Sequence, residues 1–264
     1  MITLTAMHVF PVKSCAPQSP SEVDVERRGL AGDRRWMVVD ADGRFLTARK
    51  WPRMTLVRAT PGDDVLQVDA PGMPSIEVRP HAQARRDVVV WGSALSARAA
   101  EAAADAWISA FLGCPAAFVY MDDEATRAVD PAYARSGDEV SFADGFPLLL
   151  IAQASLDGLN ERLETSVPML RFRPNLVVAG ALAHAEDAWR RIRIGAVEFD
   201  VVKPCTRCVL TTVDFVRGEF DPRGEPLRTL LTYRRGASGV TFGQNLIPRG
   251  SGTLRIGDQV DVLA

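Results

Sequence analysis

Apolar and polar residues alternate with a period of two along most of the first 92 residues. This period places side chains on opposite faces of an extended chain, so it predicts β-strands. The Asp-Gly pair at positions 42 and 43 lies between two apolar runs, which predicts a hairpin turn. The short spacing favours antiparallel structure, in a small barrel or curled sheet. The predicted strands cover residues 2–12, 35–40, 44–49, 55–60, 66–70, 76–80 and 87–91.

The period changes to that of a helix over residues 96–113, where apolar side chains recur every three to four positions. Gly113 is placed to end this helix. A strand is predicted next, over residues 115–121. Residues 122–145 are polar and contain proline and glycine, which predicts a long exposed loop of a kind that often carries function.

The second half of the chain mixes both periods. A helix capped by Ser155 is predicted over residues 154–164, and a second helix, with a proline at its start, over residues 225–235. Gly195 lies at the turn of a predicted hairpin. The predicted strands here cover residues 146–153, 173–180, 189–202, 239–248 and 252–264. The whole pattern predicts a β-rich α+β fold with a barrel-like core, flanking helices and a domain boundary near residues 113–121.

Composition narrows the class of protein. Nearly half of the 264 residues are hydrophobic and the formal net charge is −2, which gives no general attraction to nucleic acid or anionic membranes. The first residues lack the basic and apolar regions of a signal peptide, and no run of 18 apolar residues predicts a membrane span. Four cysteines are too few for a secreted disulfide scaffold. We therefore expect a cytoplasmic protein.

Two cysteines three positions apart, Cys205 and Cys208, are the main candidates for chemistry. A structural zinc site normally needs four ligands, and neither the other cysteines nor the histidines have a paired spacing. A redox pair usually precedes a helix, whereas the residues after Cys208 have the pattern of a strand. Two buried thiols, or one thiolate that binds a metal whose other ligands come from a cofactor, remain open.

Basic residues in distant loops favour a site for an anionic cofactor. Lys13 and Ser14 follow the first strand, and Arg34 precedes another strand. Arg171 and Arg173 precede a buried strand, and an arginine fork suits phosphate or carboxylate oxygens. Each of them alone is an ordinary surface charge, but together with a cysteine they indicate a cofactor site.

Several motifs resemble those of MOSC-domain proteins, in particular the mitochondrial amidoxime-reducing components and the bacterial hydroxylaminopurine-detoxifying molybdoproteins. The motifs occur in the family order from residue 3 to residue 263: "PVKSC", "DRRWMVVD", "TARKWPRM", "RFRPNLVV", "AEDAW", "VVKPCTRCVLTTVD" and "FGQNLIPRGSGTLRIGDQVDVL". The resemblance implies an N-terminal MOSC β-barrel domain over residues 1–118. It further implies a MOSC domain with a β-barrel core and flanking helices over residues 119–264, packed against the first domain.

The resemblance also implies a molybdenum cofactor, in which a pterin dithiolene and one protein cysteine bind the metal. That cysteine, the metal ligand and catalytic residue, corresponds to Cys205, with Cys208 and Arg207 beside it. Where relatives carry a Thr-Ser pair, this chain has Gly145 and Phe146, so hydroxyl contacts are lost there. Lys203 is assigned no role. The residues expected to hold the pterin and its phosphate are Lys13, Ser14, Arg34, Arg173 and Asn175.

The activity implied by the resemblance is reduction of N-hydroxylated compounds, such as hydroxylaminopurines, amidoximes and N-oxides, in detoxification. The chain has no cysteine after Cys208 and thus no ferredoxin-like cluster there, so a separate flavin or iron–sulfur protein is expected to supply electrons. Pyridoxal phosphate binding is a further association at family level. The alternatives are a carrier of the cofactor or of sulfur on Cys205, and a scaffold without activity. No nucleic-acid polymer or membrane is expected as a partner.

Overall fold

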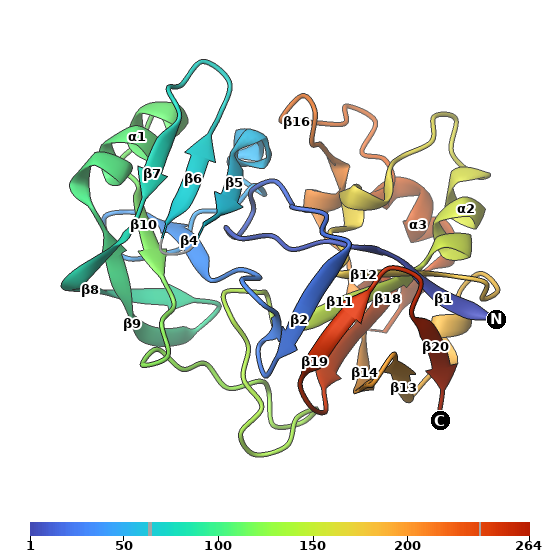
Figure 1. Ribbon diagram of the computed structural model, residues 1–264. Helices are drawn as coiled ribbons and strands as arrows, with labels where there is room; N and C mark the ends of the chain where they lie inside the picture. Colours follow the sequence, from blue (N-terminus) through green and yellow to red (C-terminus); the bar gives the residue numbers. More distant parts are fainter. Residues whose placement is uncertain (63–64, 238) are drawn as a thin grey trace.

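The computed structural model describes residues 1–62, 65–237 and 239–264. Figure 1 shows two lobes side by side, one built on strands from the first half of the chain and one built mainly on strands from the second half. Strands dominate both lobes and helices cover their outer faces, which confirms the predicted β-rich α+β class. No helix within the described residues is both long and apolar enough to cross a membrane.

The second lobe is built on a closed barrel, which among the described residues has seven strands. In spatial order the strands are β11 (Leu148–Ala152), β12 (Leu176–Ala179), β1 (Ile2–Met7), β20 (Gln259–Val262), β13 (Arg191–Ile194), β14 (Val197–Thr206) and β18 (Gly239–Pro248). Antiparallel pairing of Leu148 in strand β11 with Leu246 in strand β18 closes the barrel.

Hydrophobic burial explains why these segments form a barrel. Every residue of β11 is buried, as expected of a continuous apolar run in the centre of a protein. In β14 buried and partly exposed residues alternate, so one face of this strand lines the core. The predicted hairpin at Gly195 is confirmed, since β13 and β14 pair with Ile194 opposite Val197.

The first lobe holds two antiparallel sheets and a helix, α1 (Ala102–Leu112). The Trp107 indole donates a hydrogen bond to the Pro74 carbonyl at 2.6 Å, which ties α1 to the loop before β7. One sheet has the order β4 (Trp36–Val39), β10 (Ala117–Tyr120), β9 (Ser93–Ala100) and β8 (Pro80–Val90). The other has the order β5 (Arg58–Pro61), β6 (Leu66–Asp69) and β7 (Ile76–Val78).

Strands from the start of the chain lie in the second lobe (Figure 1), whereas Val12 and Cys15 pack in the core of the first lobe. In the barrel β1 pairs with β12 and β20. In a separate three-stranded sheet β2 (Glu22–Glu26) pairs with β19 (Gly252–Arg255) and β3 (Gly29–Leu30). The predicted domain limits of 1–118 and 119–264 stay a prediction. The remaining elements are η1 (Pro52–Leu56), α2 (Gln153–Asn160), η2 (Met169–Phe172), η3 (Ala185–Ala188), η4 (Val209–Thr212), β15 (Val213–Asp214), β16 (Glu219–Phe220), α3 (Leu227–Tyr233) and β17 (Arg235–Gly236).

Two predicted elements of the first lobe are wrong in extent. Residues 96–100 are not helical but belong to β9, where Ala97 and Ala100 are buried against neighbouring strands. Pairing with β8 and β10 therefore outweighs the helical propensity of alanine, and the helix begins only at Ala102. Residues 44–49 do not form the predicted strand, and only Arg44 and Phe45 among them make isolated bridges to other strands. The predicted end of the helix is confirmed, since Gly113 ends α1 in the left-handed conformation.

Ser155 does not cap a helix, because α2 already begins at Gln153. Its hydroxyl donates to the carboxylate of Glu186 at 2.7 Å and accepts from the backbone N–H of His184 at the same distance. Glu186 is fully buried, and burial raises the pKa of its carboxyl group although the Ser155 hydrogen bond opposes the shift. Ser155 therefore ties α2 to η3 from inside the lobe.

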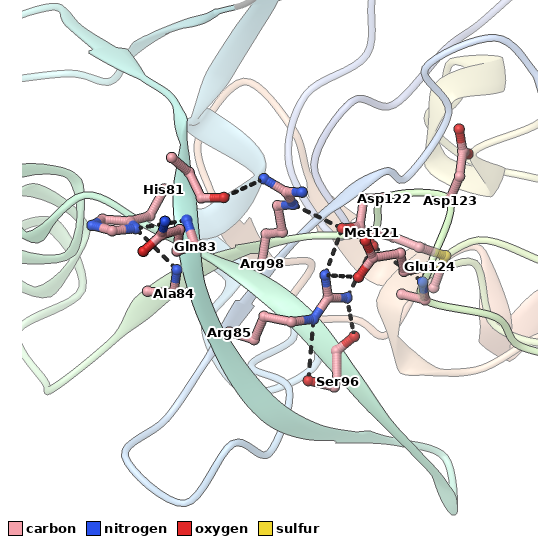
Figure 2. A network of polar contacts seen from close by, with 12 residues as sticks. His81, Gln83, Ala84, Arg85, Ser96, Arg98, Met121, Asp122, Asp123 and Glu124 are labelled. Atoms are coloured by element: carbon pink, nitrogen blue, oxygen red, sulfur yellow. Dashed lines mark hydrogen bonds and ion pairs between the residues drawn. The ribbon is translucent and has the colours of Figure 1, made fainter.

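The predicted loop over residues 122–145 is confirmed as a loop, since all of its residues are described and none lies in a helix or strand. It is not exposed throughout, because residues 140–143 are buried. Arginines from the first lobe hold its start. Figure 2 shows Arg85 and Arg98 converging on Asp122, with N–O distances of 2.6 and 2.8 Å, and this holds the pKa of Asp122 well below its usual range. Buried Arg28 donates to the carbonyls of Asp122 and Ala125. The loop is thus fixed where it crosses from one lobe to the other.

Candidate functional site

One pocket collects residues from segments far apart in the sequence. Eight of the residues singled out from the sequence line this pocket, so the structure brings them together, whereas Arg171 does not line it. Their chemical roles remain predictions. They are Lys13, Ser14, Arg34, Arg173, Asn175, Cys205, Arg207 and Cys208.

Cys205 lies in β14 at the second of two irregularities in the strand pairing with β18. The register shifts once between Val201 and Lys203 and again between Pro204 and Thr206. Bulges of this kind re-aim a side chain out of the regular alternation and are common next to functional sites. The Cys205 side chain is half-buried and lines the pocket, so a ligand in the pocket can reach its sulfur.

Arg207 fixes the Cys205 sulfur from one side. Its Nη1 donates to Cys205 Sγ at 2.9 Å, and its Nη2 donates to the carbonyl of Phe172 at 2.6 Å. A guanidinium held at both nitrogens is a rigid donor to sulfur. Arg207 can therefore orient the thiolate that the metal-ligand hypothesis requires.

The segment after Cys208 is not a strand, contrary to the prediction, but the short 3₁₀ helix η4. The hydroxyls of Thr211 and Thr212 donate to the carbonyls of Cys208 and Val209, and these side-chain bonds close the turn. Cys208 Sγ accepts from Arg49 Nε at 3.1 Å. The two thiols therefore have different guanidinium partners, and both are free.

Lys13 and Ser14 form one wall of the pocket just after β1. Ser14 has a φ of 70°, a left-handed conformation that is uncommon outside glycine and that often marks a functional site. The Lys13 ammonium is buried and donates to the carbonyl of Phe142 at 2.7 Å and to the carboxylate of Asp144. One of its three N–H groups remains for a ligand.

Arg34 and Arg173 form the opposite wall, stacked on the ring of Phe10 with guanidinium carbons 4.4 and 4.1 Å from its centroid. Both arginines have positive φ, 49° and 55°. Arg173 donates Nη1 to the Cys15 carbonyl at 2.8 Å, whereas its buried Nη2 has no partner among the described residues. Burial, and then the charge of Arg34, lower the pKa of Arg173 to about 9, so Asp33 and Asp144 compensate this charge only in part.

Asn175 acts mainly inside the protein. Its Oδ1 accepts from Arg34 Nη1 at 3.1 Å and from the backbone N–H of Leu149 at 3.2 Å, and its Nδ2 donates to the His8 carbonyl at 3.1 Å. The side chain therefore orients Arg34 and joins β12 to its neighbouring strands. Direct contact of Asn175 with a cofactor stays a prediction.

Arg171 does not join the pocket, although the sequence grouped it with Arg173. It points away, donating Nη1 to the carbonyl of Thr212 at 2.8 Å and pairing with Asp214 at 3.4 Å. The left-handed turn at Arg173 ends η2 and separates the directions of the two side chains. Only one of the two arginines is thus available to a ligand in the pocket.

Arg49 and Asp144 line the pocket and were not identified from the sequence. Asp144 accepts from Lys13, from Arg49 at 2.7 Å and from the Trp91 indole at 3.1 Å. Burial favours the neutral acid, but Lys13 and Arg49 outweigh it and hold the pKa of this half-exposed carboxyl well below its usual range. The signal for Arg49 was its place in "TARKWPRM", which carried part of the resemblance.

The charges of the pocket fit an anionic group. Among the described residues lining it, one carboxylate, Asp144, faces a larger set of cations. An anion would supply the missing partner of Arg173 Nη2. The described part of the chain has no group of three or more His, Cys, Asp or Glu side chains able to hold a metal ion, so a metal on Cys205 would need further ligands from a cofactor. The cations are Lys13, Arg34, Arg49, Arg173 and Arg207.

Binding of an anion should weaken as the pH rises through about 8. Burial is the main reason why the pKa of Lys13 falls to about 8, and Asp144 opposes the shift only in part. Loss of the Lys13 charge should lower the affinity for pyrophosphate several-fold between pH 7 and pH 8.5, below the range near pH 9 in which Arg173 also loses its proton, as measured by calorimetry. In Lys13→Arg, which stays charged, this pH dependence should flatten; an equally steep profile would assign it to another group.

The same shift affects stability. The unfolded chain keeps the Lys13 proton up to pH 10.5 while the folded chain releases it near 8, so the buried charge destabilises the fold fully below pH 8. This penalty should disappear as the pH rises from about 8 to 10.5. Anion binding and stability should therefore change in opposite directions with pH.

Comparison with known proteins gives matches over nearly the whole chain. The MOSC N-terminal beta barrel domain matches residues 1–115, and the MOSC domain matches residues 137–261. Mitochondrial amidoxime-reducing component 1 of Mus musculus is 35% identical, over 99% of this chain and 82% of that protein. The component 1 of Homo sapiens is 34% identical, over 99% and 83%, and the component 2 of Rattus norvegicus is 36% identical, over 98% and 82%.

Proposed function

The chain belongs to the family of MOSC-domain proteins that includes the amidoxime-reducing components, and from this membership we propose that it is an oxidoreductase of N-hydroxylated compounds. The substrates would be hydroxylaminopurines, amidoximes or N-oxides. The reaction would depend on a molybdenum cofactor held in the pocket. The observation that carries the proposal is the convergence of a reachable cysteine with five cations, one of which, Arg173, has a buried N–H without a partner among the described residues.

The residues of the pocket fit this cofactor in two parts. Cys205 would provide the thiolate that binds the metal, with its sulfur oriented by Arg207 Nη1. Arg173 and Lys13 would bind the phosphate. Arg173 has a buried Nη2 without a partner among the described residues, and Lys13 has one N–H group left to donate. Arg34 would add a further charge, and Ser14 a hydroxyl.

The bound cofactor would supply two-electron chemistry that removes oxygen from an N–OH or N-oxide group. The chain itself would keep the metal ligand in place and shield the phosphate charge. It would also leave the open side of the pocket to the substrate. We further propose that a separate flavin or iron–sulfur protein delivers electrons and that the enzyme works in the cytoplasm.

The proposal is tested by the metal and pterin content of protein made in a host that synthesises the cofactor. We expect molybdenum and pterin near one equivalent each, and reduction of benzamidoxime to benzamidine with an artificial electron donor. Folded protein that contains neither molybdenum nor pterin would exclude this function. Ready transfer of the cofactor to an apo-enzyme without turnover, or a cyanolysable sulfur on Cys205 without molybdenum, would instead identify a carrier.

A further inference from the structure

Trp91 lies at the tip of the β8–β9 hairpin in an unfavourable conformation. Val90 pairs with Ser93, so Trp91 and Gly92 form a two-residue turn, with φ values of 54° and 99°. Turns with two positive φ angles favour asparagine, aspartate or glycine at these positions. A bulky aromatic residue there is strained, and such strain often marks a functional role.

The Trp91 side chain is also unusual in its exposure. Trp91 is 48% exposed, whereas Trp36, Trp107 and Trp189 are each at most 6% exposed, and no other tryptophan in the described chain is classed as exposed. Burial of this apolar surface would stabilise the fold, so its exposure to water forgoes a hydrophobic contribution to folding stability. Neither the turn nor the core therefore explains the choice of tryptophan.

The ring is nevertheless fixed in one position. Its Nε1 donates to Asp144 Oδ1 at 3.1 Å, the Phe45 ring packs against it at 5.0 Å, and the Arg49 guanidinium lies 4.8 Å from its centroid. Asp144 and Arg49 both line the pocket, so the ring stands at the pocket's rim. A fixed aromatic surface loses little entropy when a ligand stacks on it.

Arg49 connects this ring to the cysteine pair of the pocket. Arg49 contacts the ring with its guanidinium and Cys208 Sγ with its Nε at 3.1 Å. Cys208 is three residues from Cys205, which limits their Cα separation to about 11 Å. A planar molecule against Trp91 would thus extend from the rim toward Cys205.

We propose that Trp91 positions planar aromatic N-hydroxylated substrates, such as benzamidoxime or hydroxylaminopurines, by stacking at the rim of the pocket. This inference rests on the proposed reductase function and specifies its substrate class. It gives aromatic substrates an advantage in binding, not in the chemical step, because Trp91 touches neither Cys205 nor any other group assigned to the metal. Aliphatic substrates with the same reacting group gain nothing from Trp91.

The test compares benzamidoxime with acetamidoxime, which shares the reacting group but has no ring. Trp91→Gly should raise the KM for benzamidoxime about tenfold, leave its kcat unchanged and alter the KM for acetamidoxime less than about twofold. Trp91→Phe should restore most of the benzamidoxime affinity. Glycine suits the positive φ of this position, so the thermal midpoint should stay within a few degrees. Phe220→Ala, at another exposed aromatic residue, should change neither KM.

Binding without turnover separates this inference from the proposed function. In calorimetry without a reductant, neutral benzamidoxime should bind the parent about tenfold more tightly than Trp91→Gly, and acetamidoxime should bind both equally. If no variant reduces either amidoxime, the reductase function fails while the benzamidoxime binding comparison still decides the role of Trp91. Equal benzamidoxime affinity in parent and Trp91→Gly overturns the role, as does a parallel loss for both amidoximes, which would indicate a surface for the electron donor.

Discussion

Replacing Cys205 by alanine should abolish benzamidoxime reduction and remove most of the bound molybdenum. The half-buried Cys205 lies in the irregularity of β14 between Pro204 and Thr206 and lines the pocket, and Arg207 already donates to its sulfur. Altering groups that only support a metal ligand typically costs 10–100-fold, so loss of the ligand itself should cost more than about 100-fold. Metal analysis and the reduction assay, on protein shown to be folded by circular dichroism, measure both effects.

Cys208→Ala is the matched control, because it removes a thiol of the same pocket. Cys208 accepts a hydrogen bond from Arg49, which also remains held by Asp144 and by the Trp91 ring. We expect this variant to keep its molybdenum and to lose less than about tenfold in activity. If Cys208→Ala loses the metal while Cys205→Ala keeps it, the assignment of the ligand is reversed.

The barrel could be predicted from the sequence because its strands are short apolar or alternating runs between turn residues. β11 and the β13–β14 hairpin are examples. The closure of the barrel could not be predicted, since it depends on pairing of Leu148 with Leu246, almost a hundred positions apart. Local propensity also misplaced the start of α1, where strand pairing of Ala97 with Arg86 outweighs it.

Residues of the candidate site could be predicted from the sequence only where the residue type alone indicates a role in binding or catalysis. Cysteines and loop cations met this condition, and the structure places them in one pocket. Asp144 did not, because an acidic residue in a polar loop gives no sign that Lys13 and Arg49 will converge on it. The divergent directions of Arg171 and Arg173 follow from a left-handed residue, which the sequence does not reveal at a non-glycine position.

Replacing Arg173 by methionine should separate stability from cofactor binding. Arg173 is a buried cation beside a second cation, Arg34, and its Nη2 has no partner among the described residues. Replacing buried charged groups by apolar side chains of similar size often leaves the stability of the fold unchanged or raises it by about 1–4 kcal/mol. Loss of the bond to the Cys15 carbonyl offsets part of this gain. The cofactor-free variant should therefore unfold in urea at the same or a higher concentration than the parent.

The same substitution should weaken binding of the cofactor, because a buried phosphate would lose its charged partner. Truncating one member of a buried, hydrogen-bonded charge pair typically costs about 2–5 kcal/mol, enough to lower the pterin content of purified protein severely. Arg173→Lys keeps the charge and should retain more pterin than Arg173→Met. If the cofactor-free Arg173→Met variant is destabilised by more than about 2 kcal/mol, the main role of Arg173 is structural, through its hydrogen bond to the Cys15 carbonyl. If stability is retained while the pterin is lost, the buried charge of Arg173 serves ligand binding, since its Nη2 has no partner among the described residues and Asp33 and Asp144 compensate the charge only in part.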